Sequence, residues 1–489
     1  MRTLISMSRL TWASAFLTIL GAKLFLVNQF GSNVPFWDQW DAEAINLYNP
    51  YLNGTLHFGD LFAAHNEHRI FVTRVFNLIL LEFNGLWFPR LQMVANALLH
   101  VAVLTGMVIV LGRQLPPISR LALAAFVALA FSLPFGWENT LAGFQSQFYF
   151  VFGFSFLAIM LTVSEKAFSL RWCLGFLALL VASVSMSSGV LAIFAIICVC
   201  ALQMLLDERQ RNSIEVIGLL VLFLAFLLIY QTVPVVEAHE ILKASSIGEF
   251  VSALVTVAAW PIPFGLLAAV LLNLPIFTLL VITVLKRRAA TRVVWLLLGT
   301  MAWVALQWVS FAYGRAEIAT SSRYTDTLMI AVVVNFAAAL YLATFTPARN
   351  WWAAVVYCLA VAVAITVFGL PAIQQARDRG NSYEVQIANM RAFYATQDLA
   401  AMKALPYFSL PYYDIDRLAM IANLPAIVSV LHPDVTGRPV TANLLLPHQV
   451  NWLFRAVQLS LLIAAPYLVA FGILSFIFSG FQILRCAIK

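Results

Sequence analysis

Residues 214–233 read IEVIGLLVLFLAFLLIYQTV, and a stretch of this kind decides the fold class of the chain. It has the length, about 20 residues, and the apolar character that a helix needs to cross a bilayer. In lipid the backbone polar groups must be satisfied within such a segment, which a helix achieves. Of the 489 residues, 62% are hydrophobic and only 10% are charged. We therefore predict an all-α polytopic membrane protein whose first partner is the lipid bilayer.

Similar apolar stretches recur along most of the chain, and their number sets the predicted topology. About twelve of them reach or approach the length of a membrane span. The predicted spans are residues 10–30, 91–112, 119–135, 147–163, 171–186, 189–206, 214–233, 264–285, 293–313, 326–346, 352–371 and 452–481.

Lysine and arginine in the short connections predict the orientation, because cytoplasmic loops carry the excess of these residues. Both termini are then cytoplasmic, and low charge with short loops favours a bacterial inner membrane. The formal net charge of +7 reflects this topology and predicts no nucleic-acid partner. Lys23, inside the first span, either snorkels to an interface or faces a cavity. The basic residues placed in the cytoplasm are Arg2, Arg9, Arg113, Arg120, Lys166, Arg171, Arg209, Arg211, Lys286, Arg287, Arg288, Arg292, Arg349, Arg485 and Lys489.

The same orientation exports the polar stretches and divides the chain into three parts. Residues 1–371 form a transmembrane core that includes the first exported loop, residues 31–90. Residues 372–450 form an exported cap segment, and residues 451–489 form the final transmembrane helix and a cytoplasmic tail. In the first loop we expect a turn at Asn53-Gly54 and an interfacial helix from Ile70 to Phe83. The cap segment is either a lid or a solvated loop without a catalytic part.

The first loop opens with Trp37-Asp38-Gln39-Trp40-Asp41, which holds the densest polar chemistry of the chain. If this stretch begins a helix, Asp38 and Asp41 share one face, and mutual repulsion or a nearby cation would shift their pKa values. A general base needs such a carboxylate. Glu43 is a third acid nearby. Trp37 and Trp40 either offer flat faces to a sugar ring or anchor the chain at the membrane interface.

The second half of the first loop reads His65-Asn66-Glu67-His68-Arg69. In a helix, His65 and Arg69 would lie one turn apart, so that histidine could move protons and arginine could clamp a phosphate. His65 and His68 could share a divalent metal, but the sequence fixes no third ligand. We therefore predict no cofactor and keep a divalent metal as the alternative. The five cysteines lie in or beside predicted spans, which supports neither a disulfide framework nor a thiolate metal site.

Another exported turn, residues 313–326, places Arg315, Arg323 and Tyr324 between two apolar helices. The positive-inside preference disfavours arginine on this side. An anionic partner explains the two arginines, because guanidinium binds phosphate oxygens in a bidentate manner. The structural alternative is that they pair with Glu317, Asp326 or lipid headgroups.

The acidic motif in a long first exported loop, the many spans, the interfacial helix and the later exported segment together resemble the integral-membrane glycosyltransferases of the GT-C class. The resemblance implies a polyprenyl-phosphate sugar donor and, as acceptor, a glycan, a lipid or a protein. It also implies a catalytic base at Asp38 or Asp41, although the spacing in this chain differs from a plain Asp-x-Asp motif. The donor phosphate would then be bound by Arg315, Arg323, Arg69 or Arg74. The substrate-binding residues would be Trp37, Trp40, Glu43, His65, Glu67, His68 and Tyr324.

The expected reaction is transfer of a monosaccharide by direct displacement, and a single base without an enzyme nucleophile implies inversion. Two other classes of protein stay open. A polymerase or ligase of lipid-linked polysaccharides would share the donor and the exported arginines. A transporter or lipid flippase would place ionisable residues at mid-membrane depth, where this sequence has few. The absence of a Walker-type phosphate loop speaks against an ATP-driven pump.

Overall fold

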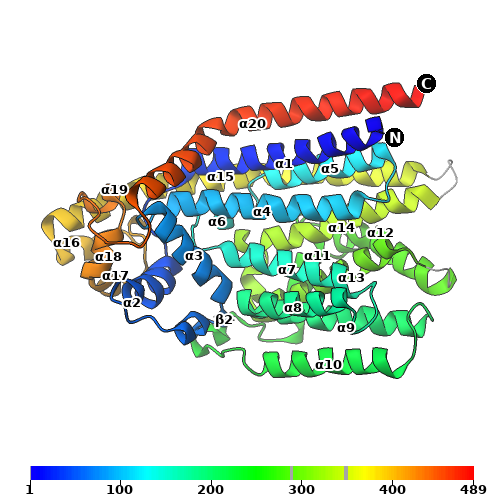
Figure 1. The fold of residues 1–489 in the computed structure, drawn as a ribbon, viewed down its shortest axis with the longest axis horizontal. Coiled ribbons are helices and arrows are strands. Elements are labelled where there is room, and N and C mark those ends of the chain that lie inside the picture. Colours follow the sequence, from blue (N-terminus) through cyan, green and yellow to red (C-terminus); the bar gives the residue numbers. More distant parts are fainter. Residues whose placement is uncertain (1, 287–289, 346–350, 489) are drawn as a thin grey trace.

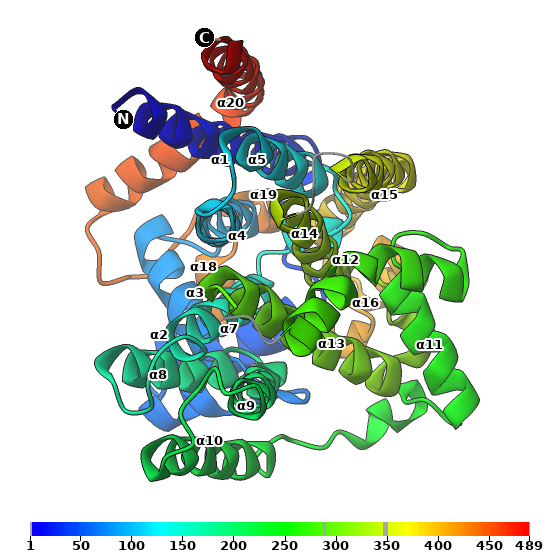
Figure 2. The ribbon, with the colours of Figure 1, turned by 90° about the vertical axis from the view of Figure 1, so that its right-hand side faces the viewer.

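The structure, a computed structural model, describes residues 2–286, 290–345 and 351–488. Its long helices lie side by side in one bundle, which Figure 1 shows from the side and Figure 2 from one end. Arg287, Arg288, Arg349 and Lys489 of the predicted cytoplasmic set lie outside the described residues. The bundle helices are α1 (Arg2–Phe30), α4 (Pro89–Gly112), α5 (Pro117–Ser132), α7 (Ser146–Thr162), α8 (Leu170–Ser185), α9 (Val190–Leu205), α10 (Ser213–Tyr230), α11 (Ile247–Ala259), α12 (Gly265–Lys286), α13 (Arg292–Gly314), α14 (Ser322–Phe345), α15 (Trp351–Thr396) and α20 (His448–Ile488).

Within the described ranges, nine helices are long and apolar enough to cross a membrane. They overlap nine of the predicted spans, so the all-α polytopic fold is confirmed. Three further predicted spans coincide with α5, α7 and α8, which have only 16, 17 and 16 residues. Twelve spans are therefore not established. The structure also contains the apolar helix α11 (Ile247–Ala259), in a part of the chain where the sequence predicted no membrane span.

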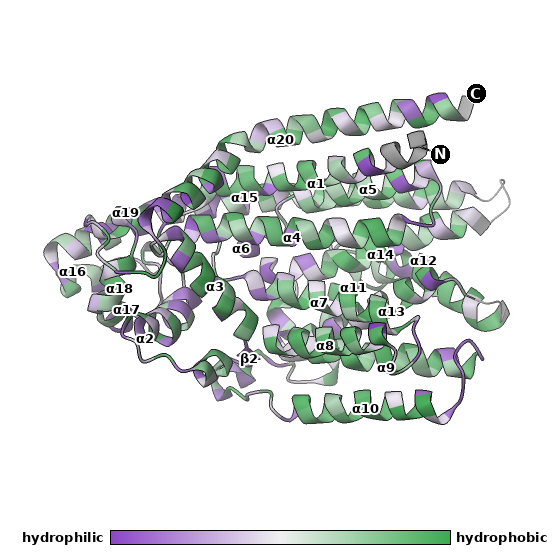
Figure 3. Cartoon of the chain, viewed as in Figure 1, coloured by the Kyte–Doolittle hydropathy of each residue, from purple (hydrophilic) through white to green (hydrophobic). Residues whose placement is uncertain are grey.

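The bundle has two ends of different character (Figures 1 and 3). At the terminal end, α1 begins at Arg2 and α20 finishes at Ile488. Several connections predicted to be basic meet there: Arg120 donates a hydrogen bond to Ser8, and Arg292 pairs with Glu165. At the opposite end, the cap end, the first loop and the cap segment stand beyond the bundle, and Figure 3 shows hydrophilic residues gathered there.

Short elements build the cap end. In the first loop these are the π-helix η1 (Gln39–Tyr48), α2 (Asn49–Leu52), the 3-10 helix η2 (Phe58–Phe62), strands β1 (Ala64–His65) and β2 (His68–Arg69), and α3 (Phe71–Asn84). In the cap segment they are α16 (Leu399–Lys403), the 3-10 helix η7 (Tyr407–Ser409), α17 (Ile415–Ala422), α18 (Pro425–Val430) and α19 (Pro433–Thr436). Between bundle helices lie α6 (Trp137–Thr140) and the 3-10 helices η3 (Ser187–Gly189), η4 (Glu237–Leu242) and η5 (Ala316–Ile318).

Helix α15 joins the bundle to the cap without a break. Its 46 residues would extend about 69 Å at the usual rise of 1.5 Å per residue. The hydrocarbon core of a bilayer is only about 30 Å thick. A helix of this length extends beyond the bilayer, so α15 carries the chain from the bundle into the cap. The boundary expected between residues 371 and 372 lies inside this one helix, which spans Trp351–Thr396.

The first loop and the cap segment share a hydrophobic core that is separate from the core of the bundle. Trp40 and Leu47 of η1 belong to it, together with Met390 of α15 and with Leu418 and Ile421 of α17. Burying these apolar side chains favours the folded cap by roughly 1.5–3 kcal/mol for each fully buried side chain. Two regions that are far apart in sequence thus fold as one unit.

Helix α3 confirms the helix expected at residues 70–83, and its faces are unusual. Arg74 and Asn77, which interrupt its apolar pattern, point inward and are buried, whereas Ile79 and Phe83 are exposed. An exposed apolar face and a polar buried face suit a helix that lies against lipid. The turn expected at Asn53-Gly54 is also present, with Gly54 at a φ of +68°.

Glu43 is the polar centre of the cap end. Its carboxylate is 1% exposed and accepts hydrogen bonds from five side chains. Tyr48 lies five residues further on, the spacing that the i→i+5 register of a π-helix brings to one face. Burial raises the pKa of Glu43 to about 7, although hydrogen bonds lower it in part. The donors are Gln39 (2.6 Å), Asn77 (2.5 Å), Gln92 (2.8 Å), Trp87 (3.1 Å) and Tyr48 (3.5 Å).

We expect Glu43→Gln to lower the free energy of unfolding by about 2–4 kcal/mol, because an amide nitrogen would face donors where the carboxylate accepted them. The measurement is the thermal unfolding midpoint in detergent. The matched control is Glu384→Gln, which changes an exposed glutamate on α15. Equal midpoints for the two variants would show that Glu43 does not organise the cap end.

Candidate functional site

Asp38 stands at the entrance of η1, on the cap end of the bundle. Its side chain is 40% exposed, and its Oδ2 lies 3.8 Å from Nε2 of His65. The preceding residue, Trp37, has a φ of +46°, a left-handed conformation that is strained for a bulky side chain. The Trp37 N–H donates a 2.8 Å hydrogen bond to the carbonyl of Pro411 in the cap segment. The cap therefore helps to hold the backbone that presents Asp38.

The pKa of Asp38 is shifted in the direction that keeps its carboxylate ionised, at the cost of weaker basicity. Burial alone would raise it, but His65 and then the positive charge of Arg323 have the larger combined effect and lower the pKa of Asp38. The group is therefore ionised over the whole physiological pH range. An ionised carboxylate can accept a proton only weakly, but its position next to cations suits charge stabilisation as well as general-base catalysis.

Asp41 has a different environment from Asp38, although the two residues are three positions apart. Its Oδ1 accepts hydrogen bonds from Nε and Nη2 of Arg417, at 2.8 and 2.5 Å, and its Oδ2 accepts one from the Tyr412 hydroxyl. Both partners belong to the cap segment. The shared helix face expected for the two acids is not formed: Asp38 faces His65, whereas Asp41 ties the first loop to the cap.

Two more residues of the predicted site are buried inside the cap end. Trp40 is fully buried, donates a 3.0 Å hydrogen bond to the carbonyl of Pro35, and packs edge-on against Trp87. Arg74 is 1% exposed, and its Nη1 donates to the carbonyls of Asp60, Leu61 and Ala63 at 3.1, 3.0 and 2.5 Å. With Glu43, these side chains support the loop and offer no open surface to a substrate.

His65 and His68 come together through a β-hairpin and not through the helix considered from the sequence. The two residues are cross-strand partners in β1 and β2, with Asn66 at a φ of +50° in the turn. Directly opposed residues of a hairpin project to the same face. Burial lowers the pKa of His68 to about 4, so this imidazole is neutral at pH 7. His65 packs edge-on against Phe144.

Glu67, in the hairpin turn, makes the second charged cluster. Its Oε1 accepts a 2.6 Å hydrogen bond from Arg315 and lies 2.5 Å from Nδ1 of His239. Burial would raise its pKa, but these partners prevail and lower the pKa of Glu67 to about 2. Arg315 thus has a carboxylate partner, although not the Glu317 or Asp326 that the sequence suggested. Arg69 is occupied with backbone carbonyls, those of Phe62 at 2.8 Å and Thr232 at 3.3 Å.

Arg323 acts electrostatically on Asp38, and part of its guanidinium group has no hydrogen-bond partner. Its Nη2 donates a 2.5 Å hydrogen bond to Glu138, which also accepts one from Ser322 at 2.8 Å. The Arg323 side chain is 37% exposed, and its Nε has no partner. Tyr324, the next residue, stacks on Phe311 with ring centroids 4.5 Å apart.

Several buried polar atoms around Asp38 have no hydrogen-bond partner in the protein. They are Nε2 of His65, Nδ1 of His68 and Nε of Arg323, which belong to residues that act electrostatically on Asp38. Buried polar groups are normally paired, so a concentration of unpaired donors and acceptors indicates water or a polar ligand. The hairpin supplies the histidine atoms, and α14 supplies the arginine atom.

An ionisable pair lies between bundle helices next to this cluster. Lys23 of α1 is buried and donates a 3.2 Å hydrogen bond to Thr140, so it does not snorkel. Its charge interacts with that of Asp326, and Asp326 accepts a 3.0 Å hydrogen bond from Asn139. Asn139 also donates to the backbone carbonyl of Arg323 at 2.8 Å. Asn139 therefore links the Asp326 side chain to the backbone of Arg323.

Four residues that complete these clusters are not among those predicted from the sequence, namely Glu138, His239, Tyr412 and Arg417. Glu138 had a usable signal, because it is an acid in a short turn between two spans, opposite the arginines at 315 and 323. The other three lie in long connections whose folding no local pattern reveals. Across the described ranges, no three histidine, cysteine, aspartate or glutamate side chains come close enough together to hold a metal ion.

No protein-family model, curated protein or solved structure matches the chain. The function must therefore be inferred from the chemistry of the site.

We expect Asp41 and Arg417 to stabilise the docking of the cap as a coupled pair. Asp41→Asn and Arg417→Met should each speed proteolysis of the cap segment, and the double variant should be less affected than the sum of the two. For a partly exposed pair the coupling should be about 0.5–1 kcal/mol. The measurement is the cleavage rate under limited proteolysis of the four proteins of the cycle. Strict additivity would show that the two side chains do not act together.

Proposed function

We propose that the protein is a membrane glycosyltransferase that moves a monosaccharide from a polyprenyl-phosphate donor to a glycan, lipid or protein acceptor. The observation that carries the proposal is the state of Asp38. Of the three acids at the start of the first loop, it alone combines a partly exposed side chain with the lack of an ion pair to arginine, and it lies 3.8 Å from Nε2 of His65, which has no hydrogen-bond partner. The bundle of apolar helices beneath it is the kind of scaffold that a lipid-linked donor requires.

The reaction in this proposal is a direct displacement. The Asp38 carboxylate accepts the proton of an acceptor hydroxyl while that oxygen forms a bond to the anomeric carbon. The bond from the anomeric carbon to the phosphate oxygen breaks, and its electron pair stays on the phosphate. With one base and no enzyme nucleophile, the configuration at the anomeric carbon inverts. No cofactor takes part in these steps.

Arg323 is the best placed of the four arginines to stabilise the departing phosphate. It acts electrostatically on Asp38, and its Nε is unpartnered, so it can bind a phosphate oxygen without losing Glu138. Charge-assisted hydrogen bonds of this type are stronger than neutral ones and favour the leaving group as negative charge develops. Arg315 is second, because its guanidinium already serves Glu67. Arg69 and Arg74 have mainly backbone partners and position the loop.

Aromatic residues beside Asp38 suit a sugar acceptor or donor. Trp37 is partly exposed and lies 6.0 Å from Tyr413, measured between ring centroids. Arg379 of α15 is held between the rings of Phe36 and Tyr383, at 3.3 and 3.7 Å from their centroids. Flat apolar faces next to polar groups are the usual way in which proteins bind pyranose rings. In the proposed orientation this end of the bundle faces the periplasm, and both termini face the cytoplasm.

One observation favours transport as a second candidate function. Lys23 and Asp326 are ionisable residues inside membrane-spanning helices, and transporters place such residues along the path of their substrates. The sequence alone showed little of this, because the two positions are more than 300 residues apart. The two functions differ in whether a glycosidic bond is broken, and a transfer assay measures that directly.

We expect Asp38→Asn to reduce transfer by roughly 10²–10⁴-fold, the usual contribution of a general base, because an amide cannot take up the acceptor proton. The assay presents purified protein in lipid with a panel of polyprenyl-phosphate monosaccharides and follows donor consumption. Asp378→Asn changes an exposed acid on α15 and should leave the rate unchanged. Full activity of Asp38→Asn would eliminate Asp38 as the base. No donor consumption by folded wild-type protein would favour polymerase, ligase or transport activity.

We expect Arg323→Gln to move the acidic limb of the pH profile of kcat/KM to higher pH. The positive charge of Arg323 helps to keep the pKa of Asp38 below its ordinary value, near 3.9, so removing that charge raises the pH at which the base becomes protonated. The quantity to compare is the pH at which kcat/KM falls on the acidic side. The absolute value of kcat/KM is less informative, because it also depends on phosphate binding. Arg377→Gln, at an exposed position of α15, is the control. An acidic limb at the same pH as in the wild type would show that Arg323 does not affect the pKa of the base.

A further inference from the structure

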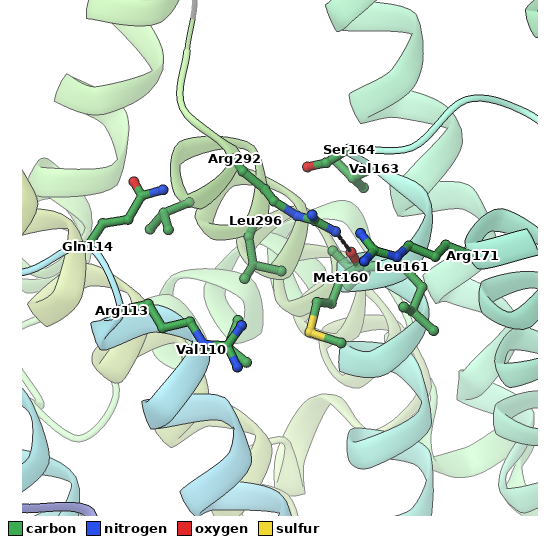
Figure 4. A pocket seen from close by; sticks show the side chains of 12 residues that line it. Val110, Arg113, Gln114, Met160, Leu161, Val163, Ser164, Arg171, Arg292 and Leu296 are labelled. Atoms are coloured by element: carbon green, nitrogen blue, oxygen red, sulfur yellow. Dashed lines mark hydrogen bonds between the residues drawn. The ribbon is translucent and has the colours of Figure 1, made fainter. Parts of the chain in front are cut away.

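A pocket of about 420 Å³ lies at the terminal end, the opposite end of the bundle from Asp38. Figure 4 shows that Arg113, Arg171 and Arg292 reach toward it from three different helices or their ends. Arg113 follows α4, Arg171 lies in the first turn of α8, and Arg292 begins α13. The floor is apolar and includes Val110 and Met160. Three guanidinium groups above an apolar floor form an amphipathic site.

The positive charge of this pocket is only partly neutralised by the protein. Glu165 pairs with both Arg171 and Arg292, through the same Oε1, at 2.9 and 3.0 Å. Arg113 is exposed and pairs with no carboxylate among the described side chains. None of the described residues that line the pocket is acidic. Three positive charges and one negative charge give the pocket a net positive charge, which favours binding of an anion. Guanidinium groups bind phosphate oxygens well.

An apolar groove of about 330 Å³ continues from this pocket along the bundle, between α4 and α7. The pocket and the groove share Val110 and Met160, so they are contiguous. From Val110 to Leu99 the groove follows eleven residue steps of α4, or about 16 Å at the helical rise. This is half of the roughly 30 Å of a bilayer core, the depth of one leaflet.

Gly106 keeps the groove open. It lies near the middle of α4 and is exposed, and a Cβ atom at this position would meet no atom within 4 Å. Close helix packing therefore does not require glycine here, although glycine destabilises a helix interior by roughly 0.5–1 kcal/mol relative to alanine. Gly153, across the groove on α7, is different, because a Cβ atom there would lie 2.9 Å from Val103. A larger residue at 106 would instead occupy the groove.

We propose that the Arg113, Arg171 and Arg292 pocket and the α4–α7 groove together bind one anionic phospholipid of the leaflet at the terminal end. The phosphate lies among the guanidinium groups, and an acyl chain follows the groove past Gly106. Because the pocket and the groove share residues, one ligand can occupy both with its headgroup and its acyl chain. The length of the groove matches the depth of one leaflet. This site is independent of the proposed transfer reaction, since it lies at the other end of the bundle.

The test is native mass spectrometry of the delipidated full-length protein, titrated in detergent with phosphatidylglycerol. Arg113→Gln should weaken binding about tenfold or more, as expected for loss of one charge-assisted contact. Gly106→Leu should abolish retention of the lipid, whereas Gly106→Ala should weaken it less. Arg485→Gln removes an exposed arginine from the same end but outside the pocket, and should bind like wild type. Unchanged elution and thermal unfolding of each variant establish that it is folded.

Three results would overturn the proposal. Equal binding of phosphatidylcholine with the same chains would remove the role of the arginines. Competition by inorganic phosphate at concentrations equal to those of the lipid would indicate a site for the free ion and not for a lipid. Wild-type affinity in both Arg113→Gln and Gly106→Leu would place the lipid elsewhere on the bundle. Loss of transfer activity in Asp38→Asn has no bearing on these measurements, so the two proposals fail or stand separately.

Discussion

The buried carboxylate of Glu43 is the interaction on which the geometry of the cap end depends. Its donors come from η1, from α3, from the connection before α4 and from α4 itself. A buried carboxyl group without partners is far more costly than one that accepts several hydrogen bonds, so separating these elements would cost the interactions that stabilise it. Because η1 begins directly after Asp38, the same carboxylate fixes where the candidate site stands relative to the bundle.

The three acids of the first loop have different roles because their surroundings differ. Glu43 is saturated with donors, Asp41 is engaged by Arg417 and Tyr412, and Asp38 keeps an exposed carboxylate. Chemically equivalent groups thus become an internal anchor, a link to the cap and a reactive candidate. The strained backbone at Trp37, held by Pro411 of the cap segment, adds to this arrangement, since strain of this kind persists only where surrounding contacts enforce it.

The two ends of the bundle use arginine in different ways. At the cap end, Arg315 and Arg323 have carboxylate partners, so an anion bound there would join an existing network. At the terminal end, three guanidinium groups surround one pocket and share a single carboxylate. The first arrangement suits a transient anion whose charge changes during a reaction, and the second suits a resident one. The apolar groove that continues from the second site strengthens this distinction.

The sequence by itself determined the all-α membrane fold, the positions of most long helices and the concentration of polar chemistry in the first loop, because apolar length and charge distribution are local properties. It also located the helix at residues 70–83 and the turn at Gly54. Only the tertiary structure decided that His65 and His68 meet in a hairpin, that Asp41 is paired with Arg417, and that Lys23 lies near Asp326. These pairings join residues that are distant in the chain or depend on the backbone path, and no periodicity encodes them. The proposal of Asp38 and not Asp41 as the base also rests on what each carboxylate touches and not on its place in the motif.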